Sequence, residues 1–130
     1  MEKIISISKA TFGEGKYDMY DGYEVVTTEQ RIRFGIENQQ SCCESWGYFI
    51  TNDETADFID AELLSVSITD TCLNSKKLEE IDAGEYTNTM FVNLETSAGL
   101  LQFVAYNSHN GFYGHDAVLI STQLNTIETL

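Results

Sequence analysis

The chain has no proline and only three cysteines among its 130 residues. Without proline, its turns must be made by Gly, Asn and Asp, and no X-Pro isomerisation slows its folding. The cysteines are Cys42, Cys43 and Cys72, an odd number with two adjacent, which is unlike the paired framework of a small secreted protein. We therefore expect reduced thiols.

Long apolar runs are also absent. No stretch reaches the roughly twenty apolar residues that cross a bilayer. The opening segment, MEKIISISKA, lacks the long apolar run and small-residue cleavage site of a signal peptide. The sequence predicts a cytoplasmic protein with no membrane association.

Basic residues are few, seven against 21 acidic ones, which gives a formal net charge of −14. Five of the seven lie within residues 1–33, so residues 34–130 carry fifteen acids against Lys76 and Lys77. A surface this negative repels nucleic-acid phosphates and attracts basic grooves. The alternative is that the charge only keeps a small domain soluble. Direct nucleic-acid binding is not expected in either case.

Against these absences, the chain has 42% hydrophobic residues and fourteen Phe and Tyr side chains, a composition that argues against disorder. Its length is typical of one domain and allows one well-formed core. We expect residues 1–130 to form a single folded domain.

Alternation of apolar and polar residues dominates the chain and is typical of β-strands. It predicts strands at residues 3–10, 23–28, 31–37, 46–51, 61–71, 89–96, 99–107 and 116–124. Short helices are expected around residues 54–59 and 76–82. The last three strands are expected to form a meander with antiparallel neighbours.

The alternation also predicts which side chains share a face. Residues 23–28 and 31–37 are expected to form a hairpin with its turn at Glu29 and Gln30. In the second strand of this hairpin the side chains that face the core are Ile32, Phe34 and Ile36, and those that face outward are Arg31 and Arg33. In residues 61–71 one face carries Leu64, Val66 and Ile68.

This pattern predicts an α+β fold: a mainly antiparallel sheet of about six or seven strands, with one or two short helices on one face. An all-β sandwich is the alternative. Parallel α/β folds are not expected, because the crossover helices that parallel strands require are missing.

Two segments look too specific to be ordinary connectors, residues 40–48 and residues 106–115. Together they contain both histidines and two of the three cysteines, which suggests zinc. Adjacent cysteines in an extended chain point to opposite faces, however, so Cys42 and Cys43 are poorly placed to share one ion. A redox switch is also disfavoured, since no basic residue adjoins the thiols. Burial near Trp46 or Phe49 is the favoured role, and no metal is expected.

Residues 106–115 have two interpretations. Asn110, Gly111 and Gly114 suit a hairpin loop whose aromatic residues fold back on the sheet. Alternatively, the loop presents its side chains to a ligand. Catalysis finds little support, because no nucleophile elbow, phosphate loop or metalloprotease helix surrounds the cysteines and histidines. We expect a protein that is not an enzyme.

Residues 40–48 and 106–118 resemble the signature stretches of a small domain family of unknown function found in phages, prophages and their bacterial hosts. In that family a Cys-Cys-Glu box follows a strand, here Cys42 to Glu44. A Tyr-Asn-x-His-Asn-Gly-aromatic-Tyr-Gly-His hairpin lies near the C-terminus, here Tyr106 to His115. The resemblance implies no activity or binding site. It implies a context in which small acidic proteins often inhibit host defence, anti-CRISPR proteins among them.

Two hypotheses follow. In the first, the chain is a stoichiometric inhibitor that fills the basic groove of a host nucleic-acid-binding protein, such as a Cas effector, in the host cytoplasm. The residues expected to make this contact are Asp53, Glu54, Asp57, Asp60, Glu62, Glu79, Glu80 and Asp82. In the second, the chain is a sponge for a small nucleotide signal. Its expected contacts are Trp46, His109, Asn110, Tyr113 and His115. Both are compatible with a homodimer, and neither requires a cofactor.

Overall fold

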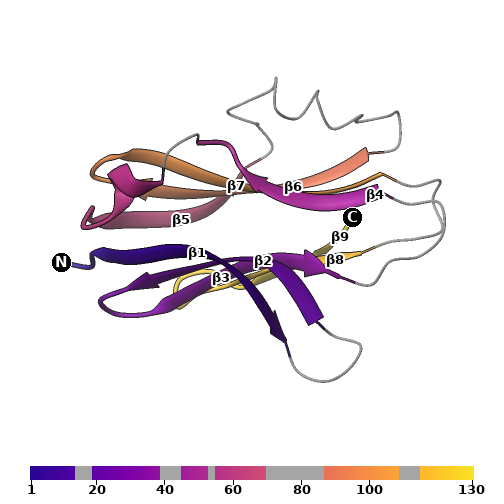
Figure 1. Ribbon diagram of the computed structural model, residues 1–130, viewed down its shortest axis with the longest axis horizontal. Coiled ribbons are helices and arrows are strands. Elements are labelled where there is room, and N and C mark those ends of the chain that lie inside the picture. The colour runs from indigo at the N-terminus through magenta and orange to yellow at the C-terminus, as the bar shows by residue number, and fades with distance from the viewer. Residues whose placement is uncertain (14–18, 39–44, 53–54, 70–86, 109–114) are drawn as a thin grey trace.

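A computed structural model describes residues 1–13, 19–38, 45–52, 55–69, 87–108 and 115–130. Within these residues two antiparallel sheets lie face to face as two layers (Figure 1). The first sheet has five strands in the order β1-β2-β3-β8-β9, and the second has four in the order β4-β7-β6-β5. The fold is a β-sandwich.

The strands of the five-stranded sheet are β1 (Ile4–Gly13), β2 (Met19–Thr27), β3 (Arg31–Glu37), β8 (Asp116–Ile120) and β9 (Thr126–Thr129). Those of the four-stranded sheet are β4 (Ser45–Ile50), β5 (Leu63–Thr69), β6 (Thr87–Thr96) and β7 (Gly99–Ser108). One 3-10 turn, η1 (Ala56–Phe58), lies between β4 and β5. The strands predicted from the alternation are thus largely present, and β9 is an addition.

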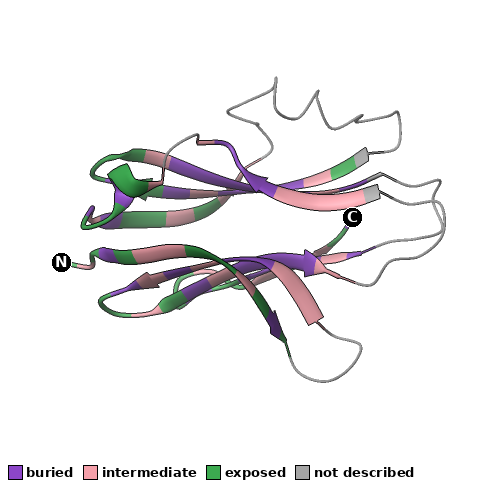
Figure 2. Cartoon of the chain, in the orientation of Figure 1, coloured by how far each residue is buried: buried purple, intermediate pink, exposed green. Residues whose placement is uncertain are grey.

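The core lies between the two sheets, and strands of both layers contribute buried residues to it (Figure 2). The predicted inward positions Ile32, Phe34 and Ile36 are buried, as expected. Phe34 stacks on Phe103 of the opposite sheet, with ring centroids 5.8 Å apart, and Tyr23 stacks on Phe103 at 5.3 Å. Aromatic side chains therefore join the two layers at the centre of the core.

The predicted α+β class is wrong, and the all-β alternative describes the fold. Residues 56–58 form a single 3-10 turn that buries only Phe58, and no α-helix occurs among the residues that the structure describes. Residues 76–82, where the second helix was predicted, lie outside them. The physical reason is that each sheet covers the apolar face of the other, so no helical layer is needed. The last three predicted strands do not form one meander either, because β6 and β7 belong to the second sheet and β8 belongs to the first.

The face predicted for residues 61–71 is wrong at one position. Leu64 is 54% exposed, whereas Leu63 is 6% exposed and belongs to the core. The cause is a register shift in which Leu63 pairs with Thr96 and Ser65 pairs with Glu95. An extra residue in one strand reverses the alternation before it, so Leu63, rather than Leu64, shares the inner face with Val66.

The predicted turn at Glu29 and Gln30 is displaced by one residue. The amide of Thr27 donates to the carbonyl of Gln30 (2.9 Å), which places Thr28 and Glu29 at the tip. The hydroxyl oxygen of Thr27 also accepts hydrogen bonds from the amides of Glu29 and Gln30. This hydroxyl stabilises a hairpin turn that lacks the usual glycine.

The predicted strand 116–124 ends early, at Ile120. The hydroxyl of Ser121 donates to the carbonyl of Leu124 (2.7 Å), and the side-chain oxygen of Asn125 accepts from the amide of Ser121 (3.1 Å). These side-chain bonds close a turn that the sequence pattern did not reveal. The chain then reverses into β9, which becomes the edge of the five-stranded sheet.

Tyr23 gives the fold a testable dependence on alkaline pH. Burial raises the pKa of its hydroxyl from 10.0 to about 12, with a smaller contribution from Tyr48. In the unfolded chain the phenol ionises near pH 10, whereas in the folded chain it stays protonated, so this stabilising contribution is complete below pH 10 and is lost as the pH rises towards 12.

We expect urea titrations at pH 9 and at pH 11.5 to show about 2 kcal/mol more loss of unfolding free energy for the wild type than for Tyr23→Phe. Ionisation of the other tyrosines and of the lysines affects both proteins and cancels in the comparison. An equal loss in the two proteins would contradict this assignment.

Candidate functional site

Three of the eight acidic residues predicted to contact a partner lie among the described residues: Asp57, Asp60 and Glu62. The structure brings these three together in η1 and the segment that leads into β5. Asp57 and Asp60 are exposed, and Glu62 is partly exposed. The other five, Asp53, Glu54, Glu79, Glu80 and Asp82, lie outside the described residues.

Backbone hydrogen bonds hold this segment against the start of β1. The amide of Asp60 donates to the carbonyl of Ile4 (2.8 Å), and the amide of Ile4 donates to the carbonyl of Ala61 (2.9 Å). Glu62 forms an antiparallel bridge with Lys3. Asp60 adopts a positive φ of 70°, a conformation that Asp and Asn tolerate better than most residues. The carboxylates of this segment are therefore carried on a fixed backbone.

Three further carboxylates, which the sequence hypothesis did not include, lie on neighbouring segments: Glu2 before β1, Glu29 in the turn between β2 and β3, and Glu95 near the end of β6. Thr28, beside Glu29, donates its amide to the carbonyl of Lys3. Ser97, which follows β6, donates its amide to the carbonyl of Glu62 (2.9 Å). The N-terminus, η1 and the turns β2–β3 and β6–β7 accordingly lie at one end of the sandwich (Figure 1). We call these six residues the acidic end: Glu2, Glu29, Asp57, Asp60, Glu62 and Glu95.

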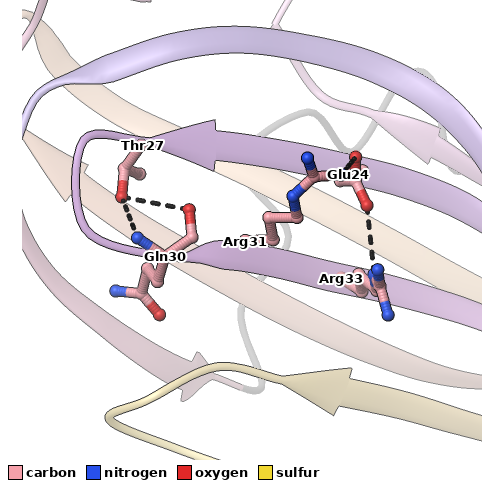
Figure 3. Close-up of polar contacts among 5 residues, drawn as sticks. All are labelled: Glu24, Thr27, Gln30, Arg31 and Arg33. Atoms are coloured by element: carbon pink, nitrogen blue, oxygen red, sulfur yellow. Dashed lines mark hydrogen bonds and ion pairs between the residues drawn. The ribbon is translucent and has the colours of Figure 1, made fainter.

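Positive charge near the acidic end is limited. Lys3 and the amino group of Met1 lie within it. Arg31 and Arg33 instead pair with Glu24 on the outer face of β2 and β3, with N–O distances of 3.5 and 3.0 Å (Figure 3). Glu24 offsets one of these two arginines, so one net positive charge remains on that face. Among the described residues, the six carboxylates of the acidic end still outnumber Lys3, the amino group of Met1 and this one remaining charge.

Two of the six carboxylates accept hydrogen bonds from neighbouring side chains. Glu2 accepts hydrogen bonds from the hydroxyl of Thr27 and from the side-chain amide of Gln30 (2.9 Å). Glu95 accepts from the hydroxyl of Ser65 (3.0 Å). Neither contact neutralises a charge, because hydroxyls and amides are neutral donors. Neither contact therefore brings a positive charge to the acidic end.

The second predicted site is described only at Trp46 and His115, because His109, Asn110 and Tyr113 lie outside the described residues. The two rings stack with centroids 5.5 Å apart and planes inclined by 29°. His115 is 4% exposed, and its Nδ1 lies 2.8 Å from the carbonyl oxygen of Glu37. Since a carbonyl only accepts, Nδ1 carries the proton of this bond. The structure thus brings Trp46 and His115 together, but their rings pack against each other.

The described residues were also compared with the predictions about metal binding, membrane association and the cysteines. Among the residues that the structure describes, no group of three or more His, Cys, Asp or Glu side chains is arranged to hold a metal ion. Within the same part of the chain, no helix has the length and apolar character needed to cross a bilayer. The vicinal Cys42 and Cys43, and Cys72, lie outside the described residues, so the prediction of their burial stays a prediction.

Among known proteins, the chain matches one family model. No curated protein and no solved structure matches the chain. A family model described as a domain of unknown function (DUF7448) matches residues 2–119, which is most of the chain. This match agrees with the expected small family of unknown function and says nothing of a phage origin. The chain belongs to this family of domains of unknown function (DUF7448).

Proposed function

We propose that the protein is a stoichiometric inhibitor of a nucleic-acid-binding defence protein, encoded by a phage or another mobile element and acting in the host cytoplasm. In this proposal the acidic end enters the basic groove in which the target holds DNA or RNA. A Cas effector is the kind of target that fits, since it holds a heteroduplex in a positively charged channel. The observation that carries the proposal is the gathering of six carboxylates on neighbouring segments at one end of the sandwich.

The arrangement of the acidic end supports this role. Double-stranded DNA presents about one negative charge per 1.7 Å of its axis, so a decoy needs several carboxylates close together. Here the carboxylates come from four separate segments, which backbone bonds and a β-bridge tie to one another. A surface whose backbone is already fixed loses little conformational entropy when it binds.

The overall charge supports the same role. With a net charge of −14, the chain as a whole is attracted to a basic groove before any contact forms. Such attraction accelerates association and discriminates against acidic partners. Salt screens it, because the Debye length falls from about 10 Å at 0.1 M to about 3 Å at 1 M. Binding by the acidic end should therefore weaken strongly as the salt concentration rises.

A double substitution tests the acidic end. We expect Asp57→Asn with Asp60→Asn to weaken binding to the target about tenfold or more in 50 mM salt, because each lost contact to a basic residue contributes about 1 kcal/mol. Asn tolerates the positive φ of residue 60, so the backbone should be unchanged. The measurement is displacement of fluorescently labelled target DNA from purified Cas effectors, followed by anisotropy at 50 and 500 mM salt.

The matched control is Asp21→Asn with Asp116→Asn, which changes the net charge equally at residues outside the acidic end. This control should displace the DNA almost as well as the wild type. The proposal fails for this target class if the wild type displaces no DNA, or if the two double variants lose the same amount of affinity.

The alternative function, capture of a nucleotide signal, has one observation in its favour, the stacked pair of Trp46 and His115. Aromatic and imidazole rings can stack on a base. However, these two rings already stack on each other, and His115 is almost fully buried. Calorimetry with cyclic nucleotides should therefore show no heat of binding, and a saturable signal that Trp46→Ala removes would favour the sponge instead.

A further inference from the structure

The edge strand β9 and the sheet face beside it expose apolar side chains. Ile127 is 69% exposed and Ile120 is 44% exposed. Both adjoin a groove of about 300 Å³. The groove is lined by Tyr20, Val118, Leu119, Ile120, Asn125, Thr126 and Ile127. None of these side chains is charged, although the net charge of the chain is −14.

The backbone of β9 has hydrogen-bonding groups that β8 does not use. His115 and Leu130 exchange two backbone bonds, of 3.1 and 2.8 Å. In an antiparallel pair, every second pair of opposite residues exchanges both backbone bonds. The next doubly bonded pairs are therefore Ala117 with Glu128 and Leu119 with Thr126. The amide and carbonyl of Ile127 and of Thr129 consequently point away from β8. They form a short, unpaired edge.

The edge strands β1 and β5 are each protected by a register shift, whereas β9 has only its short length and Glu128 as protection. β1 carries a register shift between Ile4 and Ser6, and β5 carries one between Leu63 and Ser65. The bridge between Lys3 and Glu62 further joins these two edges to each other. Bulges and lysines are the usual protections against edge-to-edge pairing. The four residues of β9, Thr-Ile-Glu-Thr, include neither lysine nor proline, and its pairing with β8 shows no register shift.

We propose that β9 pairs with β9 of a second copy of this chain. The two strands run antiparallel about a two-fold axis at Ile127, which joins two five-stranded sheets into one of ten strands. In this register the two Ile127 residues exchange both of their outward backbone bonds, and Thr129 of each copy lies opposite Asn125 of the other. The two Ile127 side chains meet on the outer face, beside the uncharged groove.

Charge and symmetry favour a second copy as the occupant and Ile127 as the centre. Two chains of net charge −14 repel each other least where the facing surfaces are uncharged, as they are in this groove; Glu128 of β9 lies on the other face of the sheet, beside Ala117. With the axis at Ile127, Glu128 lies opposite Thr126. With the axis one residue later, the two Glu128 side chains would lie directly opposite each other, which is unfavourable. An antiparallel pair about a two-fold axis is also self-complementary, which is the commonest symmetry of dimers.

The first test is the mass of the protein in solution. In 0.5 M salt, which screens the repulsion, sedimentation equilibrium should show the mass rising with concentration from 14.6 kDa towards twice that value. Ile127→Pro should lower the association constant at least about tenfold, because proline cannot donate the hydrogen bond between the copies. The substitution removes no bond to β8, since this amide points outward, so circular dichroism should show an intact fold.

A second pair of variants separates the side chain from the backbone. Ile127→Lys leaves the amide in place but adds a charge at the axis, and it should also weaken association about tenfold. Leu64→Lys is the matched control, because Leu64 is a similarly exposed apolar residue on a strand of the other sheet. It should leave the curve of mass against concentration unchanged.

A cross-link tests the register. In a chain with Cys42, Cys43 and Cys72 replaced by Ser, Ile127→Cys should form a disulfide-linked dimer under mild oxidation, because directly opposite Cα atoms in a bonded pair lie about 5.5 Å apart. Thr129→Cys should not, since its symmetry mate lies roughly four residue spacings away along the strand. A monomeric wild type at concentrations up to about 1 mM, or a dimer that Ile127→Pro and Ile127→Lys leave intact, would overturn the proposal.

Discussion

Replacing Phe103 by Ala is expected to lower the free energy of unfolding by about 3–5 kcal/mol. The ring is fully buried and stacks on both Tyr23 and Phe34, so its loss leaves a cavity between the two sheets. A loss of this size is a large part of the stability of a typical domain. Urea titration followed by circular dichroism measures it, and the variant should unfold at a much lower urea concentration.

The control for Phe103 is Ile5→Ala, because Ile5 is a large apolar residue on a strand but is 52% exposed. It should cost less than about 1 kcal/mol, since its side chain contributes little to the core. Similar losses for the two variants would mean that the sheets do not pack through Phe103.

Gly22→Ala is expected to be similarly damaging, with a loss of about 3 kcal/mol or more. Gly22 lies in β2 opposite Gly35 of β3. A Cβ at this position would lie 1.9 Å from the carbonyl oxygen of Phe34 and 2.6 Å from the Cα of Gly35. Both are backbone atoms of the neighbouring strand, so the sheet itself must move to admit a methyl group. The loss is measured by the same urea titration.

Gly47→Ala is the matched control, with the same change in another strand. There the Cβ would meet the hydroxyl of Tyr106 at 2.4 Å, which is the far end of a side chain on the outer face of the sheet. This ring can rotate away at small cost, so we expect a loss of about 1 kcal/mol or less. If Gly22→Ala were as mild as Gly47→Ala, the close approach of β2 and β3 would be refuted.

Local patterning in the sequence predicted the elements better than their assembly. Alternation located the strands, and it correctly placed Ile32, Phe34 and Ile36 in the core. It was wrong where one residue changes the register, as at Leu63 and Leu64, because a bulge leaves no compositional signal. The division of the strands between two sheets was also missed, since it depends on contacts between residues far apart in the chain.

The candidate site was predictable in part. The excess of carboxylates and the choice of Asp57, Asp60 and Glu62 as candidate contacts came from the sequence alone. The contribution of Glu2, Glu29 and Glu95 could not, because contacts between distant segments bring these residues to the same end. These contacts are the bridge of Lys3 with Glu62 and the backbone bonds from Thr28 to Lys3 and from Ser97 to Glu62. A related limit applies to Trp46 and His115, whose stacking depends on the packing of one sheet on the other.

The most direct test of the proposed function is capture of partners from host lysate, with the wild type and the Asp57→Asn, Asp60→Asn variant as baits at 50 and 500 mM salt. We predict that the wild type retains a nucleic-acid-binding protein at 50 mM salt and releases it at 500 mM, and that the variant retains much less of it. The Asp21→Asn, Asp116→Asn control should behave like the wild type. Retention of the same protein by both baits at both salt concentrations would contradict an electrostatic contact through the acidic end.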